Sequence, residues 1–355
     1  MALTLTSLPQ VAALDFDAVI DVRSPAEFAE DHLPGAVNLP VLDNEEREHI
    51  GTIYKQQSPF LARKLGAALV ARNAARHLEG PLADKPGGWR PLVYCWRGGQ
   101  RSGSFATILA QVGWRVELIE GGYKAWRKLV VEELQEHAVR SPMVVLDGNT
   151  GSAKTELLGL LASRGLQVID LEALANHRGS LFGAMPGGQP SQKAFESRLA
   201  VALAALDPAR PVVVEAESSR VGDVSLPKQI WAAMCAARRI RLSVPLAVRA
   251  DYLARAYADM TDDRARLVSV IEQLRRVHPA EIIEDWLRFV SEGAFVDLAG
   301  GLMERHYDPR YEKHRARFAE DCETVVEAKS LDPDALRGLA ERLAQSVDAA
   351  SQFRR

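Results

Sequence analysis

The sequence predicts an α/β protein of two domains, each built on a parallel β-sheet, with a helical extension at the C-terminus. Its 355 residues suffice for about two domains. Two segments, 91–112 and 143–163, each combine a short apolar strand, a glycine-bearing loop and a helical stretch, which is the repeating unit of parallel sheets. Beyond residue 246 the apolar residues recur at spacings of three and four, as in amphipathic helices. We therefore predict domains over 1–138 and 139–355.

The first predicted domain alternates strands and helices. Ser24 and Pro25 start a helix, with Glu27 at the capping-box position. The expected strands are 18–22, 36–39, 91–95 and 115–119, and the other expected helices cover about 102–112 and a charged stretch that ends near residue 137.

The second predicted domain begins with a strand at 143–147 and a helix at 155–163. Further strands are expected at 166–170, 211–215 and 240–244, and the chain from 246 onward is expected to be almost purely helical. In such sheets ligands bind beyond the carboxyl ends of the strands, so we look there for functional residues.

The composition is that of an ordinary globular protein. Hydrophobic residues make up 47% and charged residues 26%, and 44 Lys plus Arg against 47 Asp plus Glu leave a net charge of −3. These values exclude a disordered, collagen-like or strongly basic chain. The three cysteines, Cys95, Cys235 and Cys322, are odd in number and predict no disulfide framework, which favours a reducing compartment. The N-terminus lacks the basic segment of a signal peptide, and no apolar run of about 18 residues could span a membrane. We therefore expect a soluble, cytoplasmic protein.

The loop that begins at Cys95 predicts a catalytic thiolate. Cys95 ends a buried strand and precedes a helix, where backbone N–H groups can stabilise a thiolate and bind an anion. Arg97 and Arg101 add positive charge, and Arg101 could hold an oxyanion with two hydrogen bonds. Gly98 and Gly99 allow the backbone to curl around that anion. We predict Cys95 as the catalytic residue and the other four as anion-binding residues.

Two further signatures accompany this loop. They read IDVRSPAEF followed by HLPGAVNL at 20–39, and EGGYKAW at 120–126. Together they resemble rhodanese-like sulfurtransferase domains over about residues 5–130, which implies that Cys95 carries a covalently bound chalcogen. The arginine lies six positions after the cysteine, one more than in many sulfurtransferases, and this spacing resembles the wider loop of rhodanese-related phosphatases. A phosphate-bearing donor fits such a loop, and a phosphatase is the rival interpretation.

The segment DGNTGSAKT at 147–155 predicts a phosphate-binding loop. It follows a strand, opens a helix and nearly matches the pattern G-x-x-x-x-G-K-[ST]. Ala153 replaces the glycine of that pattern, and Glu215 stands at the strand end where an aspartate is usual, so the sequence argues against ATP hydrolysis but retains anion binding. Mg²⁺ could bind at Thr155, and no other metal and no tightly bound cofactor are predicted. The predicted diphosphate-binding residues are Gly148, Gly151, Ser152, Lys154 and Thr155.

Four polar clusters follow in the second half, at 177–183, 189–192, 215–220 and 306–311. Their candidate substrate-binding residues are His177, Arg178, Ser180, Gln192, Glu215, Glu217, Arg220, Tyr307, Asp308 and Tyr311.

In this order, after a rhodanese-like domain and a P-loop, the clusters resemble the tRNA 2-selenouridine synthase family over nearly the whole chain. The deciding segments are CWRGG, HRGSLFG, QPSQ, EAES and YDPRY. The resemblance implies that selenium from selenophosphate replaces the sulfur of a 5-substituted 2-thiouridine at the wobble position of tRNA. It also implies an S-geranyl-2-thiouridine intermediate made from geranyl diphosphate. Selenophosphate would bind at the cysteine loop and the diphosphate at the P-loop, and a selenophosphate-supplying enzyme is an expected partner.

A tRNA substrate requires local basic patches, because the whole chain is slightly acidic. Trp96, beside Cys95, is a candidate for stacking on a base. The candidate phosphate contacts are Arg238, Arg239, Arg241, Arg264, Arg266, Arg275, Arg276, Arg310, Lys313, His314, Arg315 and Arg317. Two other functions remain open: a sulfurtransferase fused to a nucleotide-dependent kinase or NTPase, and a non-catalytic tRNA-binding module.

Overall fold

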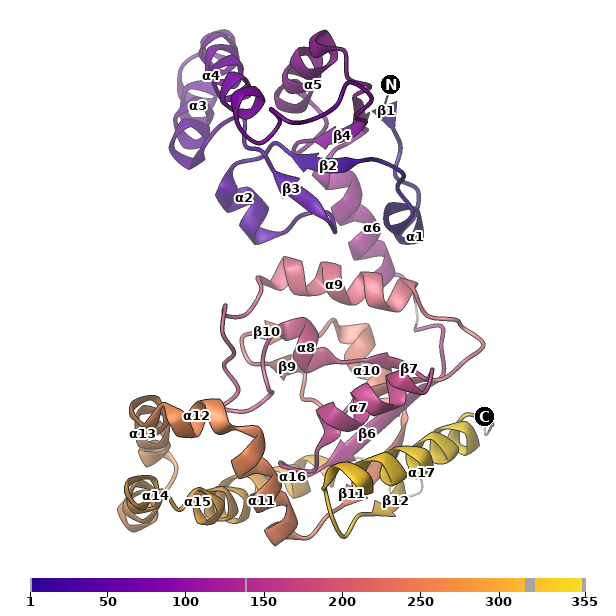
Figure 1. Ribbon diagram of the computed structural model, residues 1–355, viewed down its shortest axis with the longest axis vertical. Helices are drawn as coiled ribbons and strands as arrows, with labels where there is room; N and C mark the ends of the chain where they lie inside the picture. The colour runs from indigo at the N-terminus through magenta and orange to yellow at the C-terminus, as the bar shows by residue number, and fades with distance from the viewer. Residues whose placement is uncertain (1, 138, 317–322, 353–355) are drawn as a thin grey trace. The chain divides into compact units, whose positions relative to one another are not determined.

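A computed structural model describes residues 2–137, 139–316 and 323–352 (Figure 1). Two of the residues singled out above, Arg317 and Cys322, lie outside these ranges. The chain divides into two compact units. The first contains Met1–His137 together with Pro190–Ala205, and the second contains Ala138–Gln189 together with Leu206–Arg355. Within the described ranges no helix is long and apolar enough to cross a membrane.

The first unit is a five-stranded parallel sheet in the order β1-β5-β4-β2-β3. Its central strand, β4, is fully buried, so the position of the next residue, Cys95, is fixed by the packing of the strand. The strands are β1 Ala2–Leu3, β2 Ala18–Asp21, β3 Ala36–Asn38, β4 Pro91–Tyr94 and β5 Glu117–Ile119. The helices are α1 Leu8–Ala12, α2 Pro25–Glu30, α3 Asn44–Gln56, α4 Pro59–Glu79, α5 Gln100–Val112, α6 Tyr123–Gln135 and α9 Gln192–Ala204.

Figure 1 shows α3, α4 and α5 gathered on one side of this sheet. Buried side chains from α4 and α5, such as Val70, Phe105 and Leu109, share a core with β2 and β4. The predicted helix start at Ser24 and Pro25 is confirmed, and the Ser24 N–H donates to Glu27 Oε2 at 3.1 Å.

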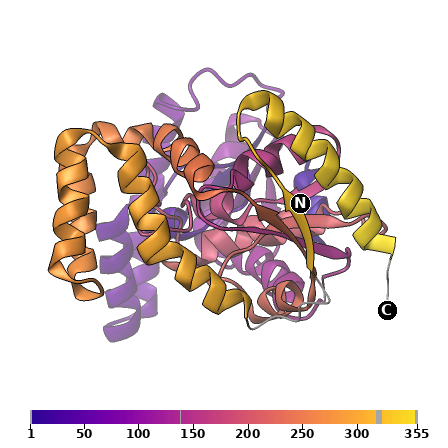
Figure 2. The same cartoon turned by 90° about the horizontal axis from the view of Figure 1, so that it is seen from below.

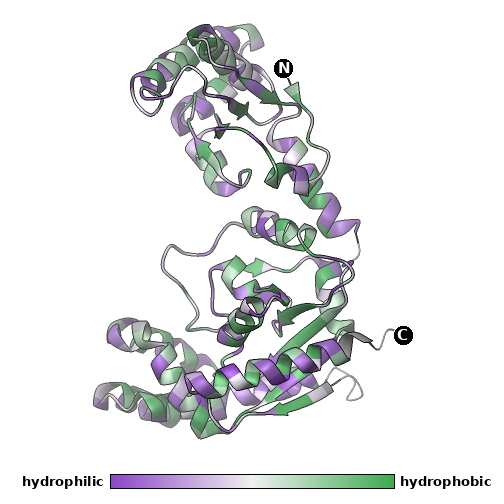
Figure 3. Cartoon of the chain, turned by 45° about the vertical axis from the view of Figure 1, so that its right-hand side comes forward, coloured by the Kyte–Doolittle hydropathy of each residue, from purple (hydrophilic) through white to green (hydrophobic). Residues whose placement is uncertain are grey.

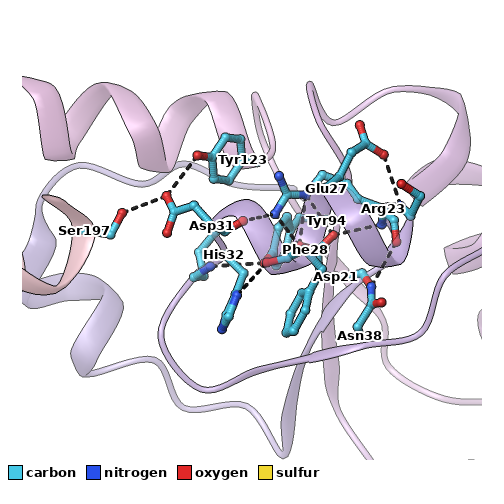
Figure 4. A network of polar contacts seen from close by, with 12 residues as sticks. Asp21, Arg23, Glu27, Phe28, Asp31, His32, Asn38, Tyr94, Tyr123 and Ser197 are labelled. Carbon is cyan, nitrogen blue, oxygen red and sulfur yellow. Dashed lines mark hydrogen bonds and ion pairs between the residues drawn. The ribbon is translucent and has the colours of Figure 1, made fainter. Parts of the chain in front are cut away.

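Helix α9 belongs to the first unit, although its sequence lies within the range 139–355 that we assigned to the second domain. The reason is a buried polar contact set on Asp31, which Figure 4 shows. Ser197 Oγ donates to Asp31 Oδ2 at 2.7 Å, and Tyr123 Oη donates to the same oxygen at 2.9 Å. Arg127 of α6 also forms an ion pair with Glu196 of α9. Local periodicity cannot reveal such long-range pairing.

The second unit contains a five-stranded parallel sheet in the order β12-β11-β6-β8-β7 and a small hairpin of β9 and β10. The strands are β6 Met143–Gly148, β7 Gln167–Ile169, β8 Val212–Glu215, β9 Arg220–Val221, β10 Val224–Ser225, β11 Arg238–Ser243 and β12 Glu323–Glu327. The helices are α7 Lys154–Ser163, α8 Leu171–Ala175, α10 Lys228–Ala236, α11 Leu246–Ala256, α12 Ala258–Asp262, α13 Arg264–Gln273, η1 Leu274–Arg276, α14 Ala280–Glu292, α15 Phe295–Leu302, the π-helix η2 Met303–Tyr307, α16 Asp308–Arg315 and α17 Pro333–Gln352.

The C-terminal part of this unit is helical as predicted, with one exception. Strand β12 pairs with β11 and extends the sheet by one edge strand, which the helical interpretation of residues beyond 246 did not include. Helix α17 then packs along the sheet and α7 (Figure 2). In Figure 3 it alternates between hydrophobic and hydrophilic colours along its length. This fits its buried residues, Leu336, Leu339, Ala340, Leu343 and Val347, which recur at helical spacing.

Candidate functional site

Cys95 lies in a cradle of hydrogen-bond donors directly after β4. Its Sγ accepts hydrogen bonds from the backbone N–H of Gly99 at 3.3 Å and from Ser102 Oγ at 3.1 Å. Only 3% of Cys95 is exposed. Burial by itself raises the pKa of the thiol, but the donors of Ser102, Arg97 and Gly99 outweigh burial, so the pKa is lowered. Cys95 is therefore predisposed to act as a thiolate. Ser102 was not predicted as a site residue, although a hydroxyl in the first turn of the helix after Cys95 is well placed to donate to the sulfur.

Arg101 is held in place by Glu27 of α2. Its Nη1 and Nη2 donate to the two carboxylate oxygens of Glu27 at 2.6 and 3.2 Å. Burial raises the pKa of Glu27, but the guanidinium of Arg101 outweighs it, so the pKa is lowered and the pair is charged. Glu27, predicted only as a helix-capping residue, thus also orients Arg101.

The other two predicted anion-binding positions differ in character. Arg97 is exposed beside the cradle. Gly98 has φ of +66°, and a Cβ there would lie 2.8 Å from the carbonyl oxygen of Ile119, so only glycine fits. In contrast, the pKa of Cys235 on α10 is raised by burial, which outweighs the opposing effect of Arg239, and no glycine-bearing loop follows Cys235 in the sequence.

In the second unit a cavity of about 830 Å³ opens beside the P-loop. It brings together residues from the P-loop, the segment after β7, the segment after β8, α11 and α16. Of the predicted residues, the following line it: Gly151, Ser152, Lys154, Thr155, His177, Arg178, Ser180, Glu217, Tyr307 and Tyr311. The sheet order explains this gathering, because β6 and β8 are neighbours and their carboxyl ends meet at one edge.

The P-loop presents a cation at the start of α7. Lys154 Nζ donates to the carbonyl oxygen of Gly148 at 2.8 Å, and its pKa is raised, because the neighbouring Tyr311 and Glu172 outweigh the opposing effect of burial. Thr155 Oγ1 donates to Glu172 Oε2 at 3.0 Å. The buried Ser152 Oγ has no hydrogen-bond partner among the residues described. A helix N-terminus with a fixed ammonium is suited to bind a diphosphate.

Ala153 adopts the left-handed conformation expected of the glycine that it replaces. Its φ and ψ are 57° and 29°. For an L-residue this conformation costs roughly 1–2 kcal/mol, so the loop keeps the P-loop shape in spite of the methyl group.

Three carboxyl groups lie close together after β7 and β8, and two of them, Glu172 and Glu217, lie near Lys154. Glu215 at the end of β8 is buried, which raises its pKa well above the usual value, and its Oε1 accepts the N–H of Glu172 at 2.8 Å. Burial and the nearby charge of Glu172 raise the pKa of Glu217 to about 8. Burial also raises the pKa of Glu172. A Cβ on Gly179 would lie 2.5 Å from Glu217 Oε1, so glycine is needed beside these groups. Glu217 can accept or release a proton near neutral pH.

Aromatic side chains form another wall of the cavity. The Arg178 guanidinium lies 4.5 Å from the ring centroid of Tyr257, and Lys154 Nζ lies 5.5 Å from that of Tyr311. Sequence reasoning missed Glu172, Tyr252 and Tyr257 as site residues. Tyr252 lies in the amphipathic helix α11 and Tyr257 directly follows it. Aromatic residues at helical spacing usually pack in a core, so the sequence offered no reason to predict a site role for them.

Several predicted residues lie elsewhere. Gln192 opens α9 in the first unit, and Arg220 is exposed on β9. Asp308 supports the loop from behind, because it pairs with Arg249 at 2.7 Å and Arg249 Nη1 donates to the carbonyl oxygen of Thr150 at 3.0 Å.

The structure also changes the choice of RNA-binding candidates. Arg239 is buried and paired with Asp147 at 3.2 Å, so it is not a phosphate contact, and Arg275 is paired with Glu272. Trp96 is half-buried, with its ring centroid 5.2 Å from that of Tyr123. Across the described ranges, no three His, Cys, Asp or Glu side chains are grouped to hold a metal ion.

Comparison with known proteins matches both units. Residues 8–129 match the rhodanese-like domain, and residues 141–277 match the tRNA 2-selenouridine synthase AAA domain. These matches confirm the predicted order of domains. Three curated proteins called tRNA 2-selenouridine synthase are similar to this chain. The one from Nitrosomonas europaea is 39% identical over 80% of this chain and 74% of its own length. The one from Chromohalobacter salexigens is 40% identical over 71% and 68%, and the one from Shewanella denitrificans is 34% identical over 82% and 77%.

Proposed function

The chain belongs to the tRNA 2-selenouridine synthase family, and from that premise we propose a reaction in two steps, one for the P-loop and one for the loop that begins at Cys95. In the first, geranyl diphosphate alkylates the sulfur of a 5-substituted 2-thiouridine at the wobble position of tRNA. In the second, selenium from selenophosphate replaces the alkylated sulfur. The observation that supports the proposal best is the cavity beside the P-loop.

This cavity combines a diphosphate site with apolar surface. The N-terminus of α7 and Lys154 favour a diphosphate, while Leu181, Met185, Leu253 and Ala256 line the same cavity. A prenyl diphosphate has this pairing of a charged head and an apolar chain. The volume is within the usual range for small-molecule sites, roughly 300–1,000 Å³.

In the proposed first step the 2-thio sulfur attacks C1 of the geranyl group. A C–S bond forms, the C–O bond to the diphosphate breaks, and the diphosphate leaves with the electron pair. Lys154 and the loop N–H groups would stabilise that leaving group. The uridine loses its N3 proton, and Glu217, with a pKa of about 8, is suited to accept it. Alkylation allows the sulfur to leave later as a thiol.

The proposed second step needs no oxidant. Selenium in selenophosphate and in 2-selenouridine has the same oxidation level. Attack by the Cys95 thiolate on the phosphorus of selenophosphate would form an S–P bond and break the Se–P bond, so that the selenium leaves as selenide. The selenide then attacks C2 while geranylthiol leaves with a proton, and hydrolysis of the S–P bond releases phosphate and restores the thiol. By contrast, a Cys95–S–Se carrier would require the removal of two electrons. The C-x5-R spacing of the loop and its bound arginine favour the phosphoryl version.

The test is a reconstitution with purified protein. A tRNA bearing wobble 2-thiouridine is incubated with geranyl diphosphate, with and without ATP, and then with selenophosphate, and the nucleosides are analysed by mass spectrometry. We expect S-geranyl-2-thiouridine without ATP and then 2-selenouridine. ATP consumption coupled to turnover, with no geranylated nucleoside, would favour the kinase or NTPase alternative instead.

This function would place the protein in the cytoplasm, with tRNA as its substrate. An enzyme that makes selenophosphate is then the expected supplier, because the second step consumes that compound. Loss of 2-selenouridine from the tRNA of cells lacking the protein would support the assignment in vivo.

A further inference from the structure

The helical hairpin of α3 and α4 ends in an exposed surface that is both aromatic and basic. We define this hairpin tip by Tyr54, Lys55, Phe60, Leu61, Arg63, Lys64 and Leu65. We propose that the hairpin tip is a contact surface for tRNA. The inference rests on the proposed function, which makes tRNA the substrate, and it places one contact outside the basic region that sequence reasoning selected.

The apolar side chains of the tip are unusually exposed. Phe60 is 70% exposed and Tyr54 is 57% exposed. Ala62, the residue that α4 buries next to the tip, lies on the opposite side of the helix from Phe60. At 100° per residue, Phe60 and Lys64 lie close together on the outward face. The two rings therefore make no contribution to the core and are available to a partner.

The stretch 49–78, which contains the end of α3 and nearly all of α4, carries charge of one sign. No Asp or Glu occurs between Glu48 and Glu79, whereas this stretch contains five Lys plus Arg and two His, namely Lys55, Arg63, Lys64, Arg72, Arg76, His49 and His77. Lys55, Arg63, Lys64 and Arg72 are exposed and form no ion pair with the residues described. A chain with a net charge of −3 thus places a group of exposed, unneutralised cations on the end of α3 and on α4.

Exposed rings beside unpaired cations fit unpaired nucleotides. Aromatic side chains stack on splayed bases, and Lys and Arg contact the phosphates between them. A tRNA offers both in its loops. A second copy of this chain fits less well, because a two-fold contact would bring identical cations together.

The free cations also distinguish the tip from the basic residues predicted earlier. Arg239 and Arg275 are occupied by Asp147 and Glu272, and Arg266 donates to the carbonyl oxygen of Ala184. Among the described residues, Lys55, Arg63, Lys64 and Arg72 of the tip and α4 have no such carboxylate partner, so they can contact a phosphate without first breaking an ion pair.

The test measures binding of fluorescently labelled tRNA to the full chain at several salt concentrations. The variants are Lys64→Glu, Phe60→Ala and Phe60→Trp. The matched control is Arg115→Glu, which reverses one exposed charge elsewhere in the first unit. Thermal unfolding of each variant checks that the fold is intact.

We expect Lys64→Glu and Phe60→Ala each to weaken binding about tenfold at roughly 0.1 M salt, with Phe60→Trp and Arg115→Glu near wild type. Lys64→Glu should also lower the magnitude of the slope of log affinity against log salt concentration by about one, because one fewer phosphate contact releases one fewer counterion. Wild-type affinity in both tip variants would overturn the proposal. So would an equal loss in the control. If light scattering shows that the tip variants dissociate an oligomer while tRNA affinity is unchanged, the tip is an interface between copies instead.

The same preparations separate this inference from the proposed function. Wild-type protein that modifies 2-thiouridine tRNA, with tip variants of unchanged KM for tRNA, would refute the tip alone. Wild-type protein that binds tRNA through the tip but modifies no 2-thiouridine would refute the reaction and leave the contact surface in place.

Discussion

Replacing Lys154 by alanine tests the P-loop as the prenyl diphosphate site. Lys154 is the ammonium of the loop, fixed by the carbonyl oxygen of Gly148 at 2.8 Å. A unit charge about 4 Å from a phosphate oxygen contributes about 4 kcal/mol at an effective dielectric constant of about 20. If that interaction stabilises the departing diphosphate, its loss lowers the rate of geranylation by about 10³-fold. Inorganic pyrophosphate should compete with geranyl diphosphate in the wild type.

The assay follows geranylation of 2-thiouridine tRNA by mass spectrometry under single-turnover conditions. Lys228→Ala is the matched control, because it removes an exposed lysine from the same unit outside the cavity lining. Lys154→Ala should leave Cys95 reactive toward small alkylating agents. Normal geranylation by Lys154→Ala, or an absolute requirement for ATP hydrolysis, would refute the assignment of the loop.

Three further predictions concern the cysteine loop and the carboxyl cluster. Cys95→Ala should abolish selenation and accumulate S-geranyl-2-thiouridine, whereas Cys235→Ala should keep both products; unaltered 2-selenouridine in Cys95→Ala would exclude a role for the thiolate. Arg101→Lys keeps the charge but loses the planar fork that Glu27 binds, so selenation should fall at least tenfold at fixed selenophosphate, and a normal selenophosphate dependence would show that charge alone suffices. Glu217 titrates near 8 in the folded chain and about 4.3 when unfolded, so its contribution to the unfolding free energy falls as pH rises between these values. The stabilising effect of Glu217→Gln on the free energy of unfolding should therefore be larger at pH 9 than at pH 5 by roughly 2–5 kcal/mol, and water in the cavity favours the lower value. Urea unfolding measures this effect. Identical pH profiles of the variant and the wild type would contradict the raised pKa.

Sequence reasoning worked where neighbours along the chain decide the structure. The capping box at Ser24 and the strand–loop–helix units around Cys95 and Lys154 are set by residues a few positions apart. Each unit needs only an apolar strand, a loop able to take the required backbone angles, and a helix start. For this reason Cys95 and Lys154 could be selected as candidate residues without coordinates, and the domain order agrees with the family matches.

Long-range pairing decided the rest. Residues 190–205 have a helical pattern that fits either domain, and long-range contacts such as those of Ser197 with Asp31 and of Glu196 with Arg127 assign α9 to the first unit. Strand β12 lies after a long helical stretch, and its pairing with β11 is not encoded in its own five residues.

By itself, then, the sequence determined the local arrangement: a cysteine in a glycine-bearing loop, a lysine at a helix N-terminus, and the succession of the two domains. Only the tertiary structure brought Glu172 and Tyr257 beside Lys154, joined Glu27 to Arg101, and withdrew Gln192 and Arg239 from the roles predicted for them. The physical reason is that a motif depends on spacing along the chain, whereas a shifted pKa, an ion pair or a cavity wall depends on which distant side chains share one region of space.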